Sequence, residues 1–363
     1  MKAVNEHYYC LDCETGIYYR SVGLTNDREV IVYPKYVPEF FGDRGKEPIQ
    51  YRGINYPTGS IRFLCSNIKW QSGNVGLKFS KKFHSFLPIT NKERVKTYSA
   101  RECLPLRLHG KGDLSLKLKK LIDLYVQNST NLTYNDFGID ASMLVGMDRA
   151  GSDIDLIVYS HKKAWEAKRV SEILVKRNLI NGPDENSEYF INRRKSYSPL
   201  MTKEEIIAWE KRKISFLYQG TKFSIMPKDL KQTDGDKYMH TNQYCAIRFK
   251  LNKDVVITDP GYLDLSNTDI GIVWGPKKIK VVRLITFLPS RMGVFLNKGD
   301  AIFSIGKLYK IVNKQGYALA QMPWDEEFTS YETRFVTKIE ITKLDQLIQS
   351  FLRVEFDENG YTT

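Results

Sequence analysis

The sequence predicts an α+β protein in which a central segment of alternating helices and strands lies between two β-rich regions. Short aromatic and β-branched runs separated by Gly, Pro, Asp and Asn fill both ends of the chain, as in strands joined by turns. The middle of the chain instead alternates helical and strand-like hydrophobic spacing. Because 363 residues exceed one typical domain, two or three domains are expected. We expect a β-rich domain over 1–105, an α/β domain over 106–235 and a small β-barrel with a terminal helix over 236–363.

The composition predicts a soluble protein with a polyanionic partner. No stretch reaches the roughly 18 consecutive apolar residues of a membrane span, and the first residues lack the apolar run of a signal peptide. Five cysteines, an odd number, fit a reducing compartment. We therefore expect a cytoplasmic protein with no membrane partner. The net charge of +13 favours a polyanion such as RNA, but lysines spread along the whole chain also fit an ordinary solvated surface.

The first strands are predicted from three short runs near the N-terminus. Residues 8–11 and 16–19 flank a polar turn, and residues 30–33 follow soon after. Prolines and glycines between residues 34 and 48 predict loops. The N-terminal region is therefore expected to be rich in both strands and loops.

The central segment opens with a helix. Apolar residues recur at helical spacing after Asp113, which is the expected N-cap. Residues 153–159 then predict a strand, and residues 162–178 predict an amphipathic helix. The polar segment 181–198 is expected to be an insertion.

A second helix and a strand pair complete the central segment. Thr202 and Glu205 have the spacing of a capping box and predict a helix start. Residues 214–218 and 222–226, separated by Gln-Gly-Thr, predict a strand pair.

The C-terminal region returns to short strands. These are expected over residues 245–251, 254–258, 278–287 and 301–311. Gly-Asp and Gly-Lys pairs punctuate the last of them, as in small barrels. A short amphipathic helix over 344–352 is expected near the end of the chain.

Two aspartates in the central segment predict a metal site. Asp153 and Asp155 belong to one expected strand, and alternate side chains of a strand point to the same face. Both carboxylates are therefore placed to hold one or two divalent cations, Mg²⁺ or Mn²⁺. Taken alone, the two residues also fit a solvent-exposed strand with alternating polar positions.

Three residues upstream of this strand predict a phosphate site. Ser142 is expected to open a short helix, and the free N–H groups of a helix start favour phosphate. Gly146 allows a tight turn, and Ser152 can cap the turn or hold a phosphate. A serine at a helix start is often only an N-cap, so the prediction depends on its combination with the two aspartates.

The run from Ala141 to Leu156 resembles the signature of the DNA-polymerase-β-type nucleotidyltransferase superfamily. That signature reads Gly-Ser, three residues, Gly, a variable gap and an Asp-x-Asp strand, and the resemblance covers residues 138 to 227. The superfamily includes tRNA CCA-adding enzymes, poly(A) polymerases and small-substrate adenylyltransferases. The chain is also similar to archaeal predicted nucleotidyltransferases in which this domain lies between two β-rich regions. Residues 94–98 and 299–308 resemble segments of that group.

The resemblance implies a polymerase-β-like nucleotidyltransferase domain that moves a nucleoside monophosphate from a nucleoside triphosphate to an acceptor hydroxyl. It implies that Asp153 and Asp155 hold Mg²⁺, which neutralises the triphosphate and polarises the attacking hydroxyl. It also implies that Ser142, Gly146 and Ser152 position the triphosphate. RNA is the acceptor class that the net charge favours.

The sequence departs from the superfamily pattern at two positions. Ala141 replaces the first glycine, and Ser224 occupies the position at which the superfamily supplies a third carboxylate. Transfer is retained if a loop acid, namely Asp229, Asp234 or Glu188, replaces that carboxylate. Otherwise the chain is a catalytically silent nucleotide- or RNA-binding protein. A transferase acting on a small molecule or a protein is the remaining alternative.

Other patterns carry weaker predictions. Cys10 and Cys13 lack the second ligand pair of a structural zinc site and are expected to be ordinary cysteines. The basic residues 193–195 lie near aromatic residues, which fits either an RNA surface or a solvated loop, and 277–283 is similar. His161 is expected at the surface, at a helix start.

Overall fold

The computed structural model describes most of the chain as one eight-stranded, one seven-stranded, one four-stranded and one two-stranded sheet with helices. The described residues are 8–24, 28–38, 44–46, 49–53, 74–83, 85–182, 202–229, 236–258, 261–286, 293–312, 314–321 and 333–335. The predicted α+β class is confirmed at this level, with more strand than helix.

The N-terminal region forms an eight-stranded antiparallel sheet. Its strands are β1 (Tyr8–Leu11), β2 (Tyr18–Leu24), β3 (Glu29–Pro38), β4 (Arg44–Lys46), β5 (Ile49–Gly53), β6 (Val75–Ser80), β7 (Ser85–Asn91) and β8 (Lys96–Ser99). The order is β4-β5-β3-β2-β1-β8, and the β6–β7 hairpin joins through β7 to β3. The strand predicted over 8–11 has the predicted bounds, and that over 30–33 is part of the longer β3. The strand predicted over 16–19 begins two residues later, at Tyr18, and continues to Leu24.

The central segment forms a four-stranded mixed sheet in the order β11-β12-β10-β9. These strands are β9 (Phe137–Ile139), β10 (Ile154–Tyr159), β11 (Ile214–Tyr218) and β12 (Thr221–Lys228). Strand β10 pairs in parallel with β12 and antiparallel with β9. The β11–β12 hairpin turns at Gln219 and Gly220, both with positive φ, which is the geometry that suits a two-residue hairpin. This strand pair was predicted and is confirmed.

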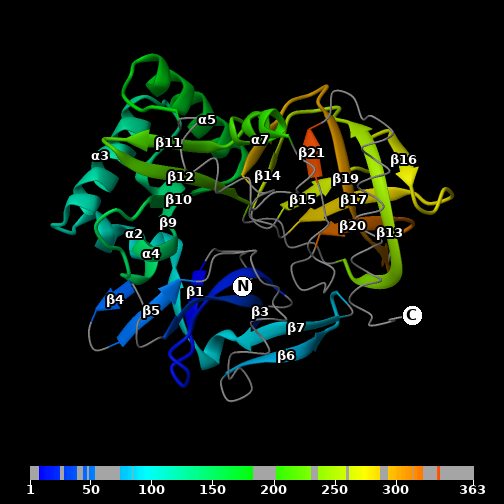
Figure 1. The fold of residues 1–363 in the computed structure, drawn as a ribbon, viewed down its shortest axis with the longest axis horizontal. Helices are drawn as coiled ribbons and strands as arrows, with labels where there is room; N and C mark the ends of the chain where they lie inside the picture. Colours follow the sequence, from blue (N-terminus) through cyan, green and yellow to red (C-terminus); the bar gives the residue numbers. More distant parts are fainter. Residues whose placement is uncertain are drawn as a thin grey trace.

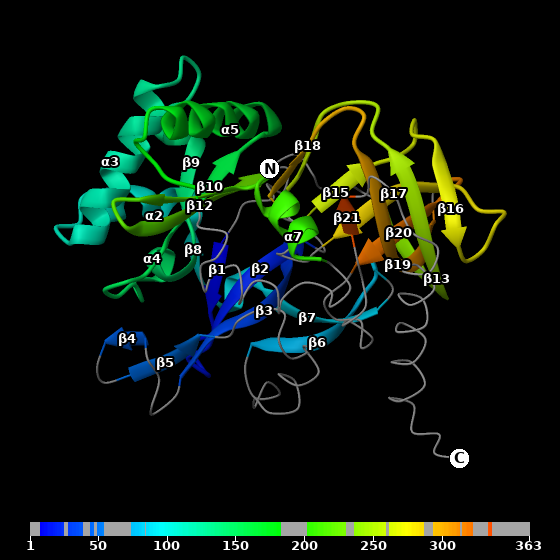
Figure 2. The ribbon, with the colours of Figure 1, turned by 45° about the horizontal axis from the view of Figure 1, so that its top comes forward.

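Five α-helices lie in the described part of the chain: α2 (Ala100–Leu108), α3 (Asp113–Gln127), α4 (Ala141–Val145), α5 (His161–Lys176) and α7 (Lys203–Glu210). Helix α5 buries one stripe, Ala164, Ala167, Val170, Ser171 and Leu174, and α3 buries a similar stripe with Tyr125 against the same core. Figures 1 and 2 show α3 and α5 on the side of the central sheet that faces away from the N-terminal sheet.

The helix boundaries agree with the sequence except at two places. The capping box of Thr202 and Glu205 is present at the start of α7. Helix α3 begins at Asp113 as expected, but its N-cap is Gly112, so the N-cap prediction is wrong by one residue. Helix α2 was not predicted, because Pro105 lies inside it and its residues have little amphipathic spacing.

The C-terminal region forms a seven-stranded sheet and a two-stranded sheet. Its strands are β13 (Tyr238–Lys250), β14 (Val255–Ile257), β15 (Gly261–Asp264), β16 (Ile270–Trp274), β17 (Val281–Thr286), β18 (Val294–Leu296), β19 (Ala301–Ile311), β20 (Tyr317–Gln321) and β21 (Thr333–Phe335). The order is β15-β17-β20-β19-β13-β16, with β21 on β19, and β14 pairs with β18. Strand β19 has the predicted bounds.

The predicted small barrel is wrong. Among the described strands, hydrogen bonding runs along an open path from β15 to β16, and these two edge strands do not pair with each other. The physical reason is that an apolar face of this sheet is buried by the N-terminal sheet. Tyr238, Ile285 and Tyr309 share one core with residues of β1, β2, β3, β6 and β7, so the sheet does not need to close on itself.

The three regions pack against one another. A second core joins the central helices and strands to Tyr36 of β3 and Phe295 of β18, and a third joins α7 to the C-terminal strands. Figure 1 shows the central and C-terminal sheets side by side, with the N-terminal sheet lying beneath both. The domain boundaries near residues 105 and 235 stay predictions.

Two further expectations meet the structure only in part. Among the described helices, none combines the length and apolar character that a membrane crossing requires. The expected helix over 344–352 and most of the expected insertion, from residue 183 onward, lie outside the described residues.

Candidate functional site

The two aspartates lie at the N-terminal end of β10. Asp153 immediately precedes the strand and Asp155 is its second residue. The Asp153 side chain is 44 % exposed, whereas Asp155 is partly buried. The two residues are two positions apart, and the charge of Asp153 helps to raise the pKa of Asp155, as expected for neighbouring carboxylates on one face. The structure therefore brings the predicted pair together at one place.

The neighbour of Asp155 on β12 is Ser224. The two residues are in register across the parallel β10–β12 pair. The Ser224 hydroxyl donates a 2.7 Å hydrogen bond to Oδ1 of Asp155. As expected, the position beside the aspartate therefore carries a hydroxyl group and not a carboxylate.

Burial, and after it the charges of Asp153 and Asp140, raise the pKa of Asp155 to about 6. The hydrogen bond from Ser224 and the charge of Lys222 act in the opposite sense. The pKa of Asp155 is raised mainly because burial disfavours the charged carboxylate. A cation bound at this carboxylate would stabilise its negative charge and so favour the ionised form.

Lys222 lies beside the first aspartate. Its Nζ is 3.6 Å from Oδ2 of Asp153, and it precedes Ser224 by two residues on the same strand. Lys222 and Ser224 therefore share one face of β12, and this face is continuous with the one that carries the aspartates. The ammonium group of lysine donates hydrogen bonds to phosphate oxygens. This face therefore carries both negatively charged aspartates and a positively charged lysine.

A third acid lies near the pair and was not predicted. Asp140 is the N-cap of α4, and its Oδ1 accepts a 2.6 Å hydrogen bond from the N–H of Ala141. Its own N–H donates to the carbonyl oxygen of Asp155 at 2.8 Å. An aspartate directly before a helix is a known N-cap signal, and this signal could have been used to find it. Ser142, the predicted helix opener, is instead the second residue of α4 and is buried.

The N-terminal sheet reaches this part of the site through Arg20 of β2. Nη2 of Arg20 lies 3.4 Å from Oδ2 of Asp140, and both side chains are about one-tenth exposed, at 11 % and 9 %. Nη1 of the same arginine donates to the hydroxyl of Tyr33 at 3.1 Å. Nothing in the sequence indicates this contact, because the pair is separated by 120 positions.

The remaining predicted site residues lie in the loop between α4 and β10. Gly146 ends α4 with φ +76°, and its N–H donates to the carbonyl oxygen of Ser142. The hydroxyl of Ser152 accepts a 3.0 Å hydrogen bond from the N–H of Arg149 and so closes the turn of the loop. Ser152 therefore has a role in shaping the loop, whatever else it binds.

Three loop acids were considered as replacements for the third carboxylate. In the described part of the chain, none of them is placed beside Asp153 and Asp155. Asp229 instead lies 3.4 Å from Nε2 of His161, at the start of α5, where burial lowers the pKa of the histidine. Asp234 and Glu188 lie outside the described residues, as do the basic residues 193–195.

Other predicted features have structural roles or remain open. Arg283 pairs with Asp236 at 2.6 Å and is not a free surface cation. Lys277 and Lys278 are exposed. Cys10 is buried and Cys13 is exposed, and both are free thiols, as expected.

The donor set fits one divalent cation better than two. Mg²⁺ commonly binds through one or two protein carboxylates, with water and substrate phosphate completing its six ligands. Asp153 and Asp155 supply that number. Within the described ranges, no group of three or more His, Cys, Asp or Glu side chains is arranged to hold a metal ion.

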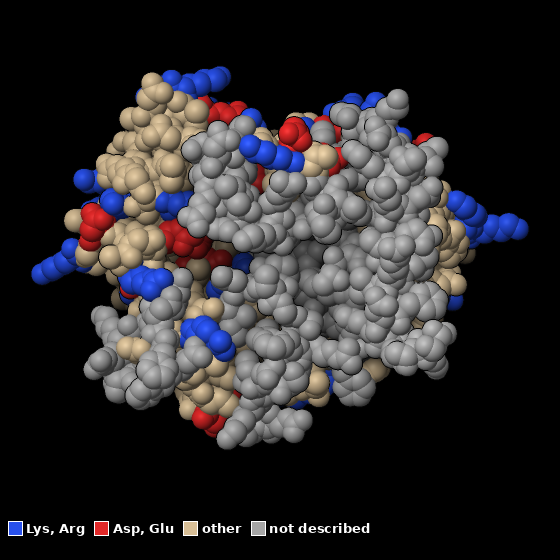
Figure 3. Space-filling view, in the orientation of Figure 1, with Lys and Arg blue, Asp and Glu red and all other residues tan. Residues whose placement is uncertain are grey.

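Charge of both signs gathers at this face of the molecule. Figure 3, in the orientation of Figure 1, shows acidic side chains in a hollow near α4 and β9, with basic side chains above and below them. Such an arrangement suits a ligand that carries both phosphate groups and a bound cation.

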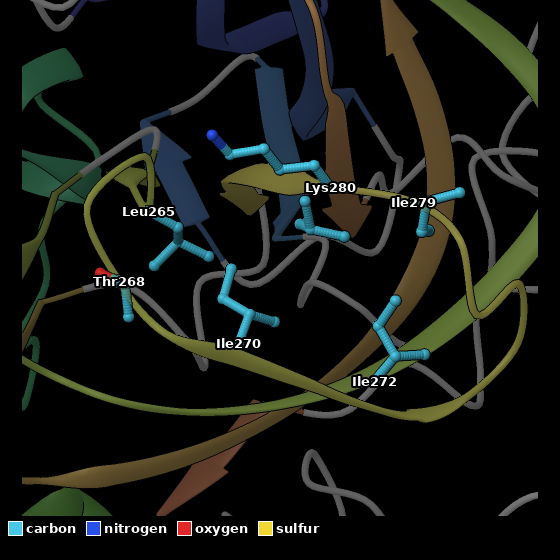
Figure 4. Close-up of a pocket in the computed structure, with 7 residues that line it drawn as sticks. Leu265, Thr268, Ile270, Ile272, Ile279 and Lys280 are labelled. Atoms are coloured by element: carbon cyan, nitrogen blue, oxygen red, sulfur yellow. The ribbon is translucent and has the colours of Figure 1, made fainter.

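A separate pocket of about 150 Å³ lies in the C-terminal sheet. It is lined by Leu265, Thr268, Ile270, Ile272, Ile279, Lys280 and Val281, and Figure 4 shows these side chains around it. Lys280 belongs to the basic segment 277–283, but the lining has no carboxylate and none of the residues predicted to bind metal or triphosphate, so this pocket is not the place of the predicted chemistry.

Comparison with known proteins leaves the family open. No protein-family model matches the chain, and no solved structure matches it. The chain is similar to the uncharacterized protein MJ1086 of Methanocaldococcus jannaschii, with 24 % identity over 188 residues. The matched segment covers 49 % of this chain and 52 % of the relative, so it spans about half the length of that protein.

Proposed function

We propose that this protein is a divalent-cation-dependent nucleotidyltransferase of the polymerase-β type. The proposal rests mainly on one observation: Asp153 and Asp155 lie together at the start of β10, directly after the short helix α4 and its glycine turn at Gly146. The run that resembles the superfamily signature thus contains a short helix, a glycine turn and a strand start that carries two aspartates.

Each residue of the site has a proposed task. Asp153 and Asp155 would bind Mg²⁺, which supplies charge neutralisation at the triphosphate. Lys222 would hold a phosphate oxygen beside Asp153, because its ammonium group already lies at that face. Asp140 would fix the start of α4 through its hydrogen bonds to Ala141 and to the strand of the aspartates. The loop closed by Ser152 would position the triphosphate.

RNA is the proposed acceptor class. The net charge of +13 and the exposed lysines at the end of β16 support a polyanionic partner. A small molecule or a protein side chain is the alternative acceptor, and a stable complex with RNA that weakens with salt would count against it.

A second candidate function is a catalytically silent nucleotide binder. The observation that favours it is the hydrogen bond from Ser224 to Asp155, which occupies the place of a third carboxylate with a neutral group. Two carboxylates and one lysine retain nucleotide binding while leaving the acceptor hydroxyl without a carboxylate base.

The test is the incorporation of label from each α-labelled nucleoside triphosphate into total small RNA, with Mg²⁺ or Mn²⁺. The wild type is compared with the double variant Asp153→Ala/Asp155→Ala. Asp148→Ala is the matched control, because Asp148 is an exposed acid of the same loop. We expect label in RNA with the wild type and the control, and none with the double variant.

Binding measurements separate the candidates if no label appears. Cation-dependent triphosphate binding that only the double variant loses would support the silent binder or another acceptor. Absence of binding by the wild type would overturn both functions.

A further inference from the structure

Arg107 lies against the glycine turn of the proposed nucleotide site. It is in the last turn of α2, a helix that packs beside α4 and β9. A Cβ built on Gly146 would be only 2.8 Å from Nη2 of Arg107. The guanidinium group therefore approaches the backbone of the turn so closely that a side chain at this position would displace it.

One nitrogen of this guanidinium group lacks a hydrogen-bond partner in the described part of the chain. Its Nε is buried and makes no hydrogen bond, and no described carboxylate pairs with it. Three other arginines with limited exposure each have a carboxylate: Arg20 with Asp140, Arg212 with Asp300 and Arg283 with Asp236. The Arg107 side chain is partly buried and its Nε is a buried donor without a partner, so an anionic ligand that accepts from this group would relieve a desolvation cost.

The position of Arg107 selects one part of the ligand. The start of α4 is tied to Asp155 through the N–H of Asp140, whereas Gly146 is at the other end of this five-residue helix. At 1.5 Å per residue, the two ends of this helix are about 7 Å apart along its axis, with Arg107 near one end and Asp155 tied to the other. A triphosphate whose first phosphate lies at the aspartates therefore extends towards Arg107.

We infer that Arg107 binds the terminal phosphates of the triphosphate and that Gly146 is the residue that lets it do so. The inference rests on the proposed nucleotide site. The planar guanidinium fork matches two phosphate oxygens, and this geometry explains an arginine at a position where a lysine would give only one point charge.

The test measures binding of inorganic tripolyphosphate and of orthophosphate by calorimetry, with Mg²⁺ present, to the full chain. Arg107→Gln is expected to weaken tripolyphosphate binding about tenfold or more, because a charge-assisted hydrogen bond is lost. Arg107→Lys should recover part of the loss. Orthophosphate cannot contact the cation at the aspartates and Arg107 together, so Arg107→Gln should weaken its binding less than that of tripolyphosphate.

Arg101→Gln is the matched control. Arg101 lies on the same helix, is exposed, and stacks over the Tyr159 ring at 4.2 Å, away from the glycine turn. Its loss should leave tripolyphosphate binding unchanged. The four nucleoside triphosphates are measured in parallel on the wild type and on Asp153→Ala/Asp155→Ala.

The outcomes distinguish this inference from the proposed function. Equal tripolyphosphate binding by the wild type and Arg107→Gln, with nucleotide binding still lost in the aspartate variant, overturns the role of Arg107 alone. Binding that depends on Arg107, in a protein that transfers no nucleotide, supports the inference and leaves the silent binder. No binding of any polyphosphate by the wild type overturns both. If Arg107→Gln does not fold, Arg107→Lys decides, because equal binding by this variant also contradicts the inference.

Discussion

At the scale of single residues, Asp155 is the group whose chemistry the fold changes most. It is partly buried between β9 and β12, with the charges of Asp153 and Asp140 nearby and a hydrogen bond from Ser224. In the absence of a cation, ionisation of this carboxyl is unfavourable in the folded chain. Its titration should therefore appear in the stability of the protein.

We predict that the free energy of unfolding in the presence of a chelator falls as the pH rises from about 4 to about 6 because of Asp155. In this window the folded state retains a proton that the unfolded chain has released, so raising the pH favours unfolding. Asp155→Asn removes this dependence. Urea unfolding at several pH values should show the variant gaining stability over the wild type across the window, with a constant difference above it.

The control for this prediction is Asp148→Asn in the exposed loop. A difference between Asp155→Asn and the wild type that does not change with pH would contradict the assignment of the raised pKa to Asp155.

The sequence predicted part of this site at the residue scale. The alternation of strand residues was sufficient to place Asp153 and Asp155 on one face, and the resemblance to the superfamily indicated Ser224 as their neighbour. The departure at Ala141 also has a structural counterpart, because its φ is +52°, in the region that favours glycine. Arg107 could not be predicted, because its position depends on how α2 packs, and α2 itself was not recognised.

At the scale of elements, α4 is held from outside the central sheet. This five-residue helix is too short to be stable alone. Its N-cap Asp140 is tied to Arg20 of β2, which is in turn held by Tyr33 of β3. The N-terminal sheet thus stabilises the helix that precedes the aspartates.

We predict that Arg20→Met lowers the free energy of unfolding by about 3 kcal/mol, because it leaves the buried carboxylate of Asp140 without its cation. Asp140→Asn keeps the N-cap oxygen but removes the charge. The double variant should therefore lose less than the sum of the single variants, with a coupling of about 1–3 kcal/mol in urea unfolding. Additive losses would show that the ion pair does not link β2 to α4.

Elements with strong local signals were predicted and elements without them were not. Three features were predicted correctly: the capping box of α7, the turn of the β11–β12 hairpin and the apolar run of β19. Each of them depends only on residues that are close together in the sequence. By contrast, β16 and β20 are short, and their pairing depends on distant strands. The barrel prediction was wrong for the same reason, since local patterns do not reveal which sheet covers another.

At the scale of the whole molecule, the N-terminal and C-terminal sheets share a core. Phe83 stacks on Tyr238 with ring centroids 5.7 Å apart, and the N–H of Tyr238 donates to the carbonyl oxygen of Lys82 at 2.6 Å. These contacts connect the loop after β6 to the first residue of β13. The two sheets should therefore lose structure together.

We predict that Phe83→Ala destabilises the protein by about 3–5 kcal/mol, because Phe83 is 1 % exposed and its removal leaves a cavity. Amide hydrogen exchange should accelerate in both sheets. Phe79→Ala is the control, since Phe79 is 46 % exposed on β6, and it should cost less than about 1 kcal/mol. Faster exchange confined to the N-terminal sheet would contradict a shared core.

This shared core also sets an order of events during synthesis. Strands β1 to β8 are synthesised before the C-terminal strands. The residues that cover their apolar face include some that are made much later, as far along the chain as Ala320. At 5–20 residues per second, the interval between residue 99 and residue 320 lasts roughly 10–45 s. For that time the nascent first sheet presents Ile31, Leu87 and Ile89 without their final neighbours, so chaperones are expected to bind this part of the chain as it is made.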